Sequence, residues 1–215
     1  MADMATLRQG VRESLPELDD IQDADLRSKV VEVLALALSE TEFGRLDEMR
    51  PSGNYNTPAM LRGTQADHFR GVAQMAVALA DGIEAVMGPI GIDRDMLIAG
   101  ALCHDAGKPY EFSPRNIERW QANSGAVGFP SVRHPGYGVH LALTVGLPEA
   151  IVHIIGAHSM HAEGQFVQPS LENVLIQYAD DAFWQSPGTG RTHGDLSPRQ
   201  PNSTVPPLSI LAIPV

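Results

Sequence analysis

The sequence has a single cysteine, Cys103, among its 215 residues. One thiol excludes an internal disulfide framework, and the apolar neighbours of Cys103 favour a place in the core over one beside a reactive site. No run approaches the roughly 18 apolar residues of a membrane-spanning helix, and the polar N-terminus lacks the apolar centre of a secretory signal. We therefore expect a cytoplasmic protein without a membrane partner.

Basic charge is also scarce, with 15 lysines and arginines against 26 acidic residues and a net charge of -11. Such a chain has no broad basic face for a phosphate backbone, so we expect a small-molecule substrate and no nucleic acid partner. Alternation of apolar and polar residues is missing, which argues against a sheet. The apolar residues recur with helical spacing, and the sequence predicts an all-α fold of one domain.

We expect about six to eight helices, arranged in three parts of the chain. Residues 1–50 would form N-terminal helices packed on a core at 51–185, and the proline-rich residues 186–215 would form an extended arm. The arm ends in the apolar "LSILAIPV", which predicts docking on the core or a homo-oligomer formed through the arm. Helices are predicted at 23–43, 64–88, 93–107, 135–146, 148–157 and 170–184, with a short piece at 116–120. The helix at 93–107 is apolar almost all round, with Asp93 as its N-cap and Gly107 as its C-cap, so it should be central and buried.

The apolar faces of these helices carry titratable residues. A titratable side chain that is only solvated would lie on the polar face, so these residues are candidates for a buried site. His68 extends a helical stripe that continues through Val72, Met75, Leu79, Ile83 and Val86. His158 and Asp180 lie on helix faces that also carry isoleucines. His104 and Asp105 lie at the end of the central helix, and His134 stands before Pro135 at a helix start. The whole inward set is His68, His104, Asp105, His134, His158 and Asp180.

These four imidazoles and two carboxylates indicate a metal site. Hydrogen-bonded core histidines and capping aspartates are the alternative, but four inward imidazoles all need an acceptor or a metal at their second nitrogen. Mixed nitrogen and oxygen ligands suit Fe, Mn, Co, Ni or Zn, and six side chains are too many for one catalytic ion with an open position. Two ions sharing Asp105 account for the count, with His134 and His158 either filling the second site or lining the pocket.

The ordered set resembles the HD-domain superfamily of metal-dependent hydrolases. Its signature corresponds to His68, to "HDAGK" at 104–108, and to "YAD" ending at Asp180. "RHPGYG", with His134, and "VHIIGAH", with His158, look like the two further histidines of its dinuclear members. The resemblance covers about residues 64–184. It implies a helical bundle that holds two transition metal ions, Fe or Mn first, with Zn, Ni or Co as alternatives.

The resemblance also implies roles for the residues beside the metals. In such hydrolases a metal-bound water attacks phosphorus and the lysine of "HDxGK" steadies the substrate's charge, which gives catalytic roles to Asp105 and Lys108. A helix-capping cation is the alternative for Lys108. Substrate contacts are expected from Lys108, Arg133, Tyr110 and His161. The Gly-Tyr-Pro loop of the cyclic-di-GMP phosphodiesterase branch is missing, and the aromatic loop at 108–133 suits a small, partly apolar substrate.

Three functions stay open at this point. The first is a metal-dependent hydrolase of a small metabolite with a phosphoester or similarly activated bond. The second is a mixed-valent di-iron oxygenase that cleaves a C–C or C–P bond with O2, as in myo-inositol oxygenase-like HD proteins, because the six ligands are common to both. Tyr55 would mimic the mobile tyrosine of the phosphonate-cleaving oxygenases, but its loop lacks the expected acidic partner. The third is a ligand sensor that keeps a metal site.

Overall fold

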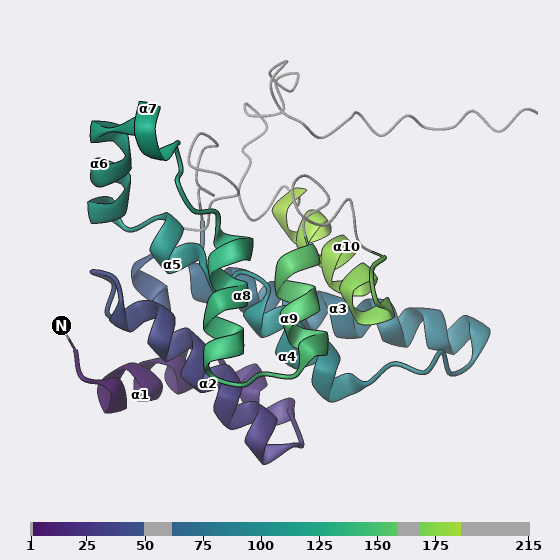
Figure 1. Ribbon diagram of the computed structural model, residues 1–215. Helices are drawn as coiled ribbons and strands as arrows, with labels where there is room; N and C mark the ends of the chain where they lie inside the picture. Colours follow the sequence, from purple (N-terminus) through teal and green to yellow (C-terminus); the bar gives the residue numbers. More distant parts are fainter. Residues whose placement is uncertain (1, 50–61, 159–167, 186–215) are drawn as a thin grey trace, which may run out of the picture.

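The computed structural model describes residues 2–49, 62–158 and 168–185 (Figure 1). No strand occurs in these ranges, which confirms the all-α prediction. Eight of the α-helices there have nine or more residues, in agreement with the expected six to eight, and two have four. The α-helices are α1 (Met4–Ser14), α2 (Ala24–Ser39), α3 (Gln65–Met87), α4 (Arg94–Cys103), α5 (Lys108–Glu111), α6 (Pro114–Ala122), α7 (Ser124–Val127), α8 (His134–Thr144), α9 (Glu149–Ala157) and α10 (Leu171–Gln185). The expected arm at 186–215 lies outside the described residues.

Helix α4 is the centre of the bundle, as its sequence predicts. It contacts α2, α3, α9 and α10, and every residue from Leu97 to Cys103 is buried. Asp93 caps its N-terminus by accepting a hydrogen bond from the Met96 amide, and burial raises the pKa of the Cys103 thiol far above its usual range. Gly100 permits the close approach of α9, since a Cβ there would lie 2.6 Å from the Ile154 Cδ1.

The predicted end of this helix is wrong. Helix α4 stops at Cys103, and residues 104–107 form turns that lead directly into α5. Gly107 has a right-handed backbone (φ -81°, ψ -6°), so it is no left-handed C-cap. It is needed for another reason: a Cβ at this position would overlap the His134 carbonyl oxygen and lie 2.8 Å from the Gly138 nitrogen. The turn after α4 therefore packs backbone to backbone on the first turn of α8.

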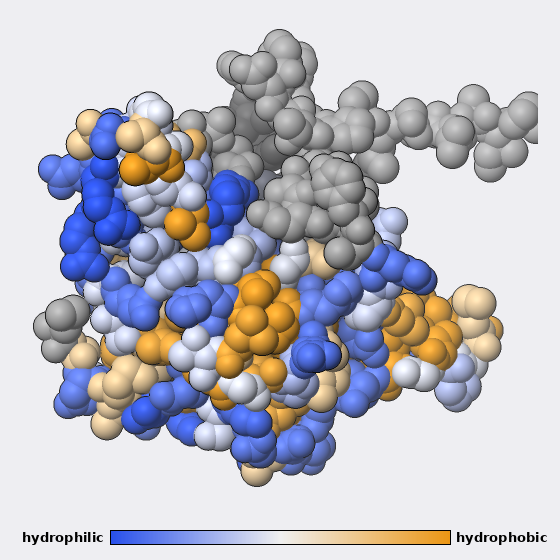
Figure 2. All heavy atoms as spheres, in the orientation of Figure 1, coloured by the Kyte–Doolittle hydropathy of each residue, from blue (hydrophilic) through white to orange (hydrophobic). Residues whose placement is uncertain are grey.

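Helix α3 fills the predicted range 64–88, with Thr64 and Gly88 as its caps. The Thr64 side chain and the Asp67 side chain form a reciprocal capping box, and Gly88 ends the helix with φ +81°. The expected inward stripe holds only for its first half, because Leu79 is 36% and Val86 86% exposed. The end of α3 projects from the bundle, and Figure 2 shows apolar side chains gathered there.

The remaining helices complete the walls around α4. Helix α10 packs along α3 so closely that a Cβ at Gly71 would overlap the Phe183 ring, and α8 and α9 pack as an antiparallel pair (Figure 1). The N-terminal helices share one buried apolar cluster with this bundle through residues such as Leu7 and Val30. Within the described residues, no helix combines the length and apolar character needed to cross a bilayer.

Candidate metal centre

The structure brings the six residues of the expected ligand set together from five separate segments of the chain. Five of them are buried, and Asp180 has 27% of its side chain exposed. The elements that carry them are α3 for His68, the turn after α4 for His104 and Asp105, the first position of α8 for His134, the residue after α9 for His158, and α10 for Asp180.

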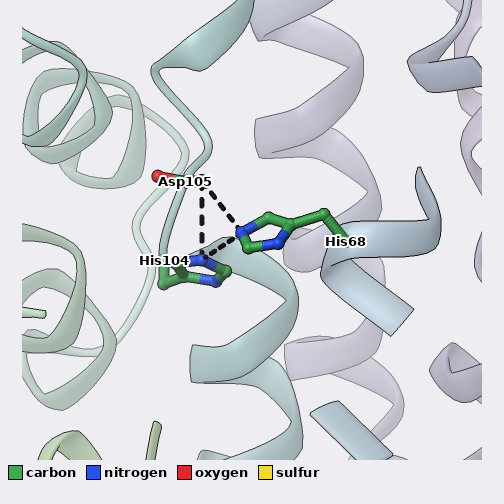
Figure 3. A group of neighbouring side chains, drawn as sticks. All are labelled: His68, His104 and Asp105. Carbon is green, nitrogen blue, oxygen red and sulfur yellow. Dashed lines mark hydrogen bonds and ion pairs between the residues drawn. The ribbon is translucent and has the colours of Figure 1, made fainter. Parts of the chain in front are cut away.

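Asp105 lies at the centre, and its two carboxylate oxygens face different histidine pairs. Oδ2 is 3.3 Å from His68 Nε2 and 3.5 Å from His104 Nε2, the group drawn in Figure 3. Oδ1 is 3.2 Å from His134 Nε2 and 3.5 Å from His158 Nε2. Within each group of three residues, the donor atoms lie within 4.8 Å of one another, a spacing that suits a common metal ion.

Asp180 adds a second carboxylate to the first group. Its Oδ1 is 3.3 Å from His68 Nε2 and 3.9 Å from His104 Nε2, and these two nitrogens are 3.2 Å apart. The first group thus offers two nitrogens and two oxygens. The second group, from the described residues, offers two nitrogens and the other oxygen of Asp105.

Hydrogen bonds at Nδ1 fix the tautomer of three of the histidines. His104 donates to the Ala101 carbonyl at 2.6 Å, and His158 donates to the Ile155 carbonyl at 2.9 Å. His134 donates through Nδ1 to the carboxylate of Glu111 at 2.6 Å. A neutral imidazole that donates at Nδ1 has a lone pair at Nε2. These lone pairs point at carboxylate oxygens or at another ring nitrogen, an arrangement that a cation between them would satisfy.

The charge states at neutral pH suit a divalent cation. Burial lowers the pKa of His104 to about 4 and that of His134 to about 3, so both rings are neutral at pH 7 and able to act as ligands. Burial also opposes ionisation of Asp105, but the charge of Lys108 and the hydrogen bond with His158 hold its pKa well below the usual range. At His158, burial is outweighed by the hydrogen bond and charge of Asp105, which raise its pKa.

His68 differs from the other three histidines. Its Nδ1 is buried and has no hydrogen-bond partner among the described residues. Its ring is held by aromatic neighbours instead, with the Phe183 ring centroid at 5.6 Å and that of Trp184 at 6.4 Å. Imidazole nitrogens and carboxylate oxygens together form a donor set that fits divalent transition metals.

Of the residues expected to contact substrate, Lys108 lies at the centre. Its Nζ is 3.9 Å from Asp105 Oδ1 and 5.3 Å from the Phe112 ring centroid, and the side chain is 3% exposed. Arg133 donates from Nη1 to Glu111 Oε1 at 2.8 Å. Tyr110 stacks on Tyr137 with centroids 3.8 Å apart. The expected contact at residue 161 and the tyrosine at 55 lie outside the described residues.

Two residues of this region were missed by sequence reasoning. Glu111 is buried and accepts hydrogen bonds from His134 and Arg133. Gln65 is buried at the start of α3, and its Nε2 donates to Asp105 Oδ2 at 3.4 Å. Helical periodicity does not mark Glu111, because α5 has only four residues. Gln65, three residues before His68, does share the inward face of α3.

Comparison with known proteins identifies the family. The HD domain matches residues 66–183, a range that includes all six residues of the centre. The chain belongs to the HD domain family.

The chain is also similar to the dihydroneopterin 2′,3′-cyclic phosphate phosphodiesterase of Methanocaldococcus jannaschii, with 28% identity over 169 residues that cover 76% of this chain and 65% of that protein. The matched part of this chain thus spans just under two thirds of that relative's length. No solved structure matches it.

Proposed function

We propose that this HD protein is a metal-dependent phosphohydrolase that cleaves a phosphoester bond of a small metabolite at a centre of two ions bridged by Asp105. One observation carries the proposal: the two oxygens of Asp105 face two separate histidine pairs, at 3.2 to 3.5 Å. A bridging carboxylate needs this geometry. The phosphodiesterase activity named for the relative supports the same reaction class.

The residues divide into two ligand sets. His68, His104, Asp180 and Asp105 Oδ2 would hold one ion, and His134, His158 and Asp105 Oδ1 the other. Neither set fills an octahedron, so positions remain for water and substrate. When bound, the ions supply a Lewis acid for the phosphoryl oxygens and a bound water of lowered pKa. Fe or Mn is our first expectation, followed by Zn, Ni or Co.

The protein's own groups prepare the substrate side of the centre. The ammonium of Lys108 lies beside Asp105, where it would attract and orient an anionic phosphate. Arg133, Tyr110 and His161 remain our predicted substrate contacts. Burial excludes bulk water around the ligands, which strengthens each of these charge interactions.

Hydrolysis is favoured over the oxygenase alternative because the relative is named for breaking a phosphodiester bond. A small cyclic phosphodiester is therefore the first substrate class to test. Turnover of such a substrate with release of a phosphomonoester supports the proposal. An iron pair that consumes O2 and leaves phosphodiesters intact contradicts it.

Metal analysis combined with one substitution tests the centre. We expect wild-type protein purified from cells to contain close to two transition metal ions per chain. Asp105→Ala should lose both ions and all phosphodiester hydrolysis, because the shared ligand disappears. Asp181→Ala, at the exposed aspartate next to Asp180, is the matched control and should keep both. An Asp105→Ala protein that retains metal and turnover contradicts the proposal.

A further inference from the structure

His134 differs from His104 and His158 in its place within a helix. His104 and His158 follow the last residue of α4 and α9, so their Nδ1 groups reach carbonyls in the last turn of the same helix. Carbonyls in a last helical turn lack intrahelical partners and are available for this purpose. His134 is the first residue of α8 and has no helical carbonyl behind it. The acceptor for its Nδ1 has to come from another element.

Glu111, the last residue of α5, supplies that acceptor. Its Oε2 accepts hydrogen bonds from both the Nδ1 and the backbone amide of His134, each at 2.6 Å. Its Oε1 accepts from Arg133 Nη1 at 2.8 Å, and the carboxylate side chain is fully buried. Neither His134 nor Arg133 caps α8 with its own side chain, so Glu111 also satisfies an unpaired amide at this helix N-terminus.

We propose that Glu111 is a positioning residue that prepares one half of the metal centre, the half formed by His134, His158 and Asp105 Oδ1. One carboxylate fixes the backbone start of α8, the orientation of the His134 ring and its Nδ1–H tautomer. The lone pair of His134 Nε2 is thereby directed at Asp105 Oδ1, 3.2 Å away. The inference rests on the proposed two-ion function and names the residue that sets the affinity for the second ion.

The other half of the centre does not depend on Glu111. His68, His104 and Asp180 come from α3, the turn after α4 and α10. Among the described residues, their hydrogen bonds and ion pairs are with one another, with Asp105 and, for His104, with the Ala101 carbonyl. Loss of the Glu111 carboxylate should therefore weaken the binding of one ion and spare the other. Partners that orient a metal-binding histidine typically change metal affinity about 10- to 100-fold.

Titration of metal-depleted, full-length protein with Mn²⁺ by calorimetry tests this inference without a substrate. Glu111→Gln keeps the side-chain volume, but its amide nitrogen must face either His134 or Arg133, both of which are donors. We expect two binding steps in the wild type, and in Glu111→Gln one step about 10- to 100-fold weaker with the other unchanged. Glu111→Asp keeps the carboxylate and should recover part of the lost affinity.

Glu17→Gln is the matched control. Glu17 is also a buried carboxylate, and it accepts hydrogen bonds from Arg70 Nε at 3.1 Å and from Gln74 Nε2 at 2.6 Å. This variant should lower the unfolding temperature and leave both Mn²⁺ steps unchanged. Glu111 has only a structural role if Glu111→Gln behaves like this control, or if both steps weaken equally; either result overturns the inference.

The titration also separates this inference from the proposed function. A wild-type protein that binds a single ion refutes the two-ion function and the role of Glu111 with it. Two steps in the wild type, unchanged in Glu111→Gln, refute the role of Glu111 alone. If Glu111→Gln does not fold, Glu111→Asp carries the same comparison, and affinity equal to the wild type at both steps overturns the inference.

Discussion

Substitution of Gly107 by alanine should damage the metal centre although the backbone there allows any residue. With φ -81° and ψ -6°, an alanine in open surroundings would stabilise the fold by about 0.4 to 1 kcal/mol through the unfolded state. The surroundings are closed, however. The added Cβ would overlap the His134 carbonyl oxygen and lie 2.8 Å from the Gly138 nitrogen. Both are backbone atoms of α8, so no side chain can rotate to make room.

The expected size of the effect follows from this contact. Overpacking of a buried position costs about 1 to 3 kcal/mol, and subtraction of the alanine gain from the middle of this range leaves roughly 1 to 2 kcal/mol of lost unfolding free energy. For a chain of this length that lowers Tm by roughly 2 to 8 °C. The turn must also move away from His134, and a misplacement of about 1 Å at a catalytic centre costs on the order of 100-fold in kcat/KM.

Thermal unfolding and hydrolysis of a chromogenic phosphodiester would measure the two effects. Gly136→Ala is the matched control, because Gly136 lies in the same first turn of α8 and a Cβ there would have no neighbour within 4 Å. We expect that control to raise Tm slightly and to leave kcat/KM unchanged. Wild-type Tm and kcat/KM in Gly107→Ala would refute the claim that close backbone packing positions His134.

Three further predictions concern protonation, packing and charge. Burial lowers the pKa of His104 from 6.5 to about 4, so the folded protein binds fewer protons than the unfolded chain between these values. The unfolding free energy of metal-depleted protein should therefore fall as the pH is lowered through this range, as measured by denaturant titration at several pH values. Gly71→Ala should overlap the Phe183 ring and lower Tm by separating α10 from α3, measured by calorimetry. Lys108→Met should keep both metal ions but raise KM for a phosphodiester about 10-fold or more, whereas Lys29→Met, at the other lysine, should not.

The sequence predicts the elements whose signals are local. Thr64 and Gly88 mark the ends of α3 because capping depends on side chains and backbone within a few residues. The convergence of the histidines is likewise visible, because a polar residue on an apolar helix face points inward. Periodicity does not show where a helix leaves the bundle, so Leu79 and Val86 were wrongly expected to be buried.

The parts that sequence reasoning missed depend on contacts between distant segments. Gly107 reads as a C-cap, since nothing nearby reveals that α8 will lie against it. Glu111 stands 22 residues before Arg133 and 23 before His134, and its four-residue helix has no apolar face to compare it with. Such roles follow from the tertiary packing that brings α5 and α8 together.

The distribution of the proposed ligands along the chain would make an occupied centre a non-covalent cross-link. The side chains from His68 to Asp180 belong to five segments that meet only in the folded bundle, so ions held by them bind the folded state alone. Binding of this kind adds about 2.7 kcal/mol of stability when free metal exceeds its dissociation constant 100-fold. A chain with one cysteine has no disulfide for this purpose. In the proposed two-ion form, the metals that perform the chemistry also join the helices that hold them.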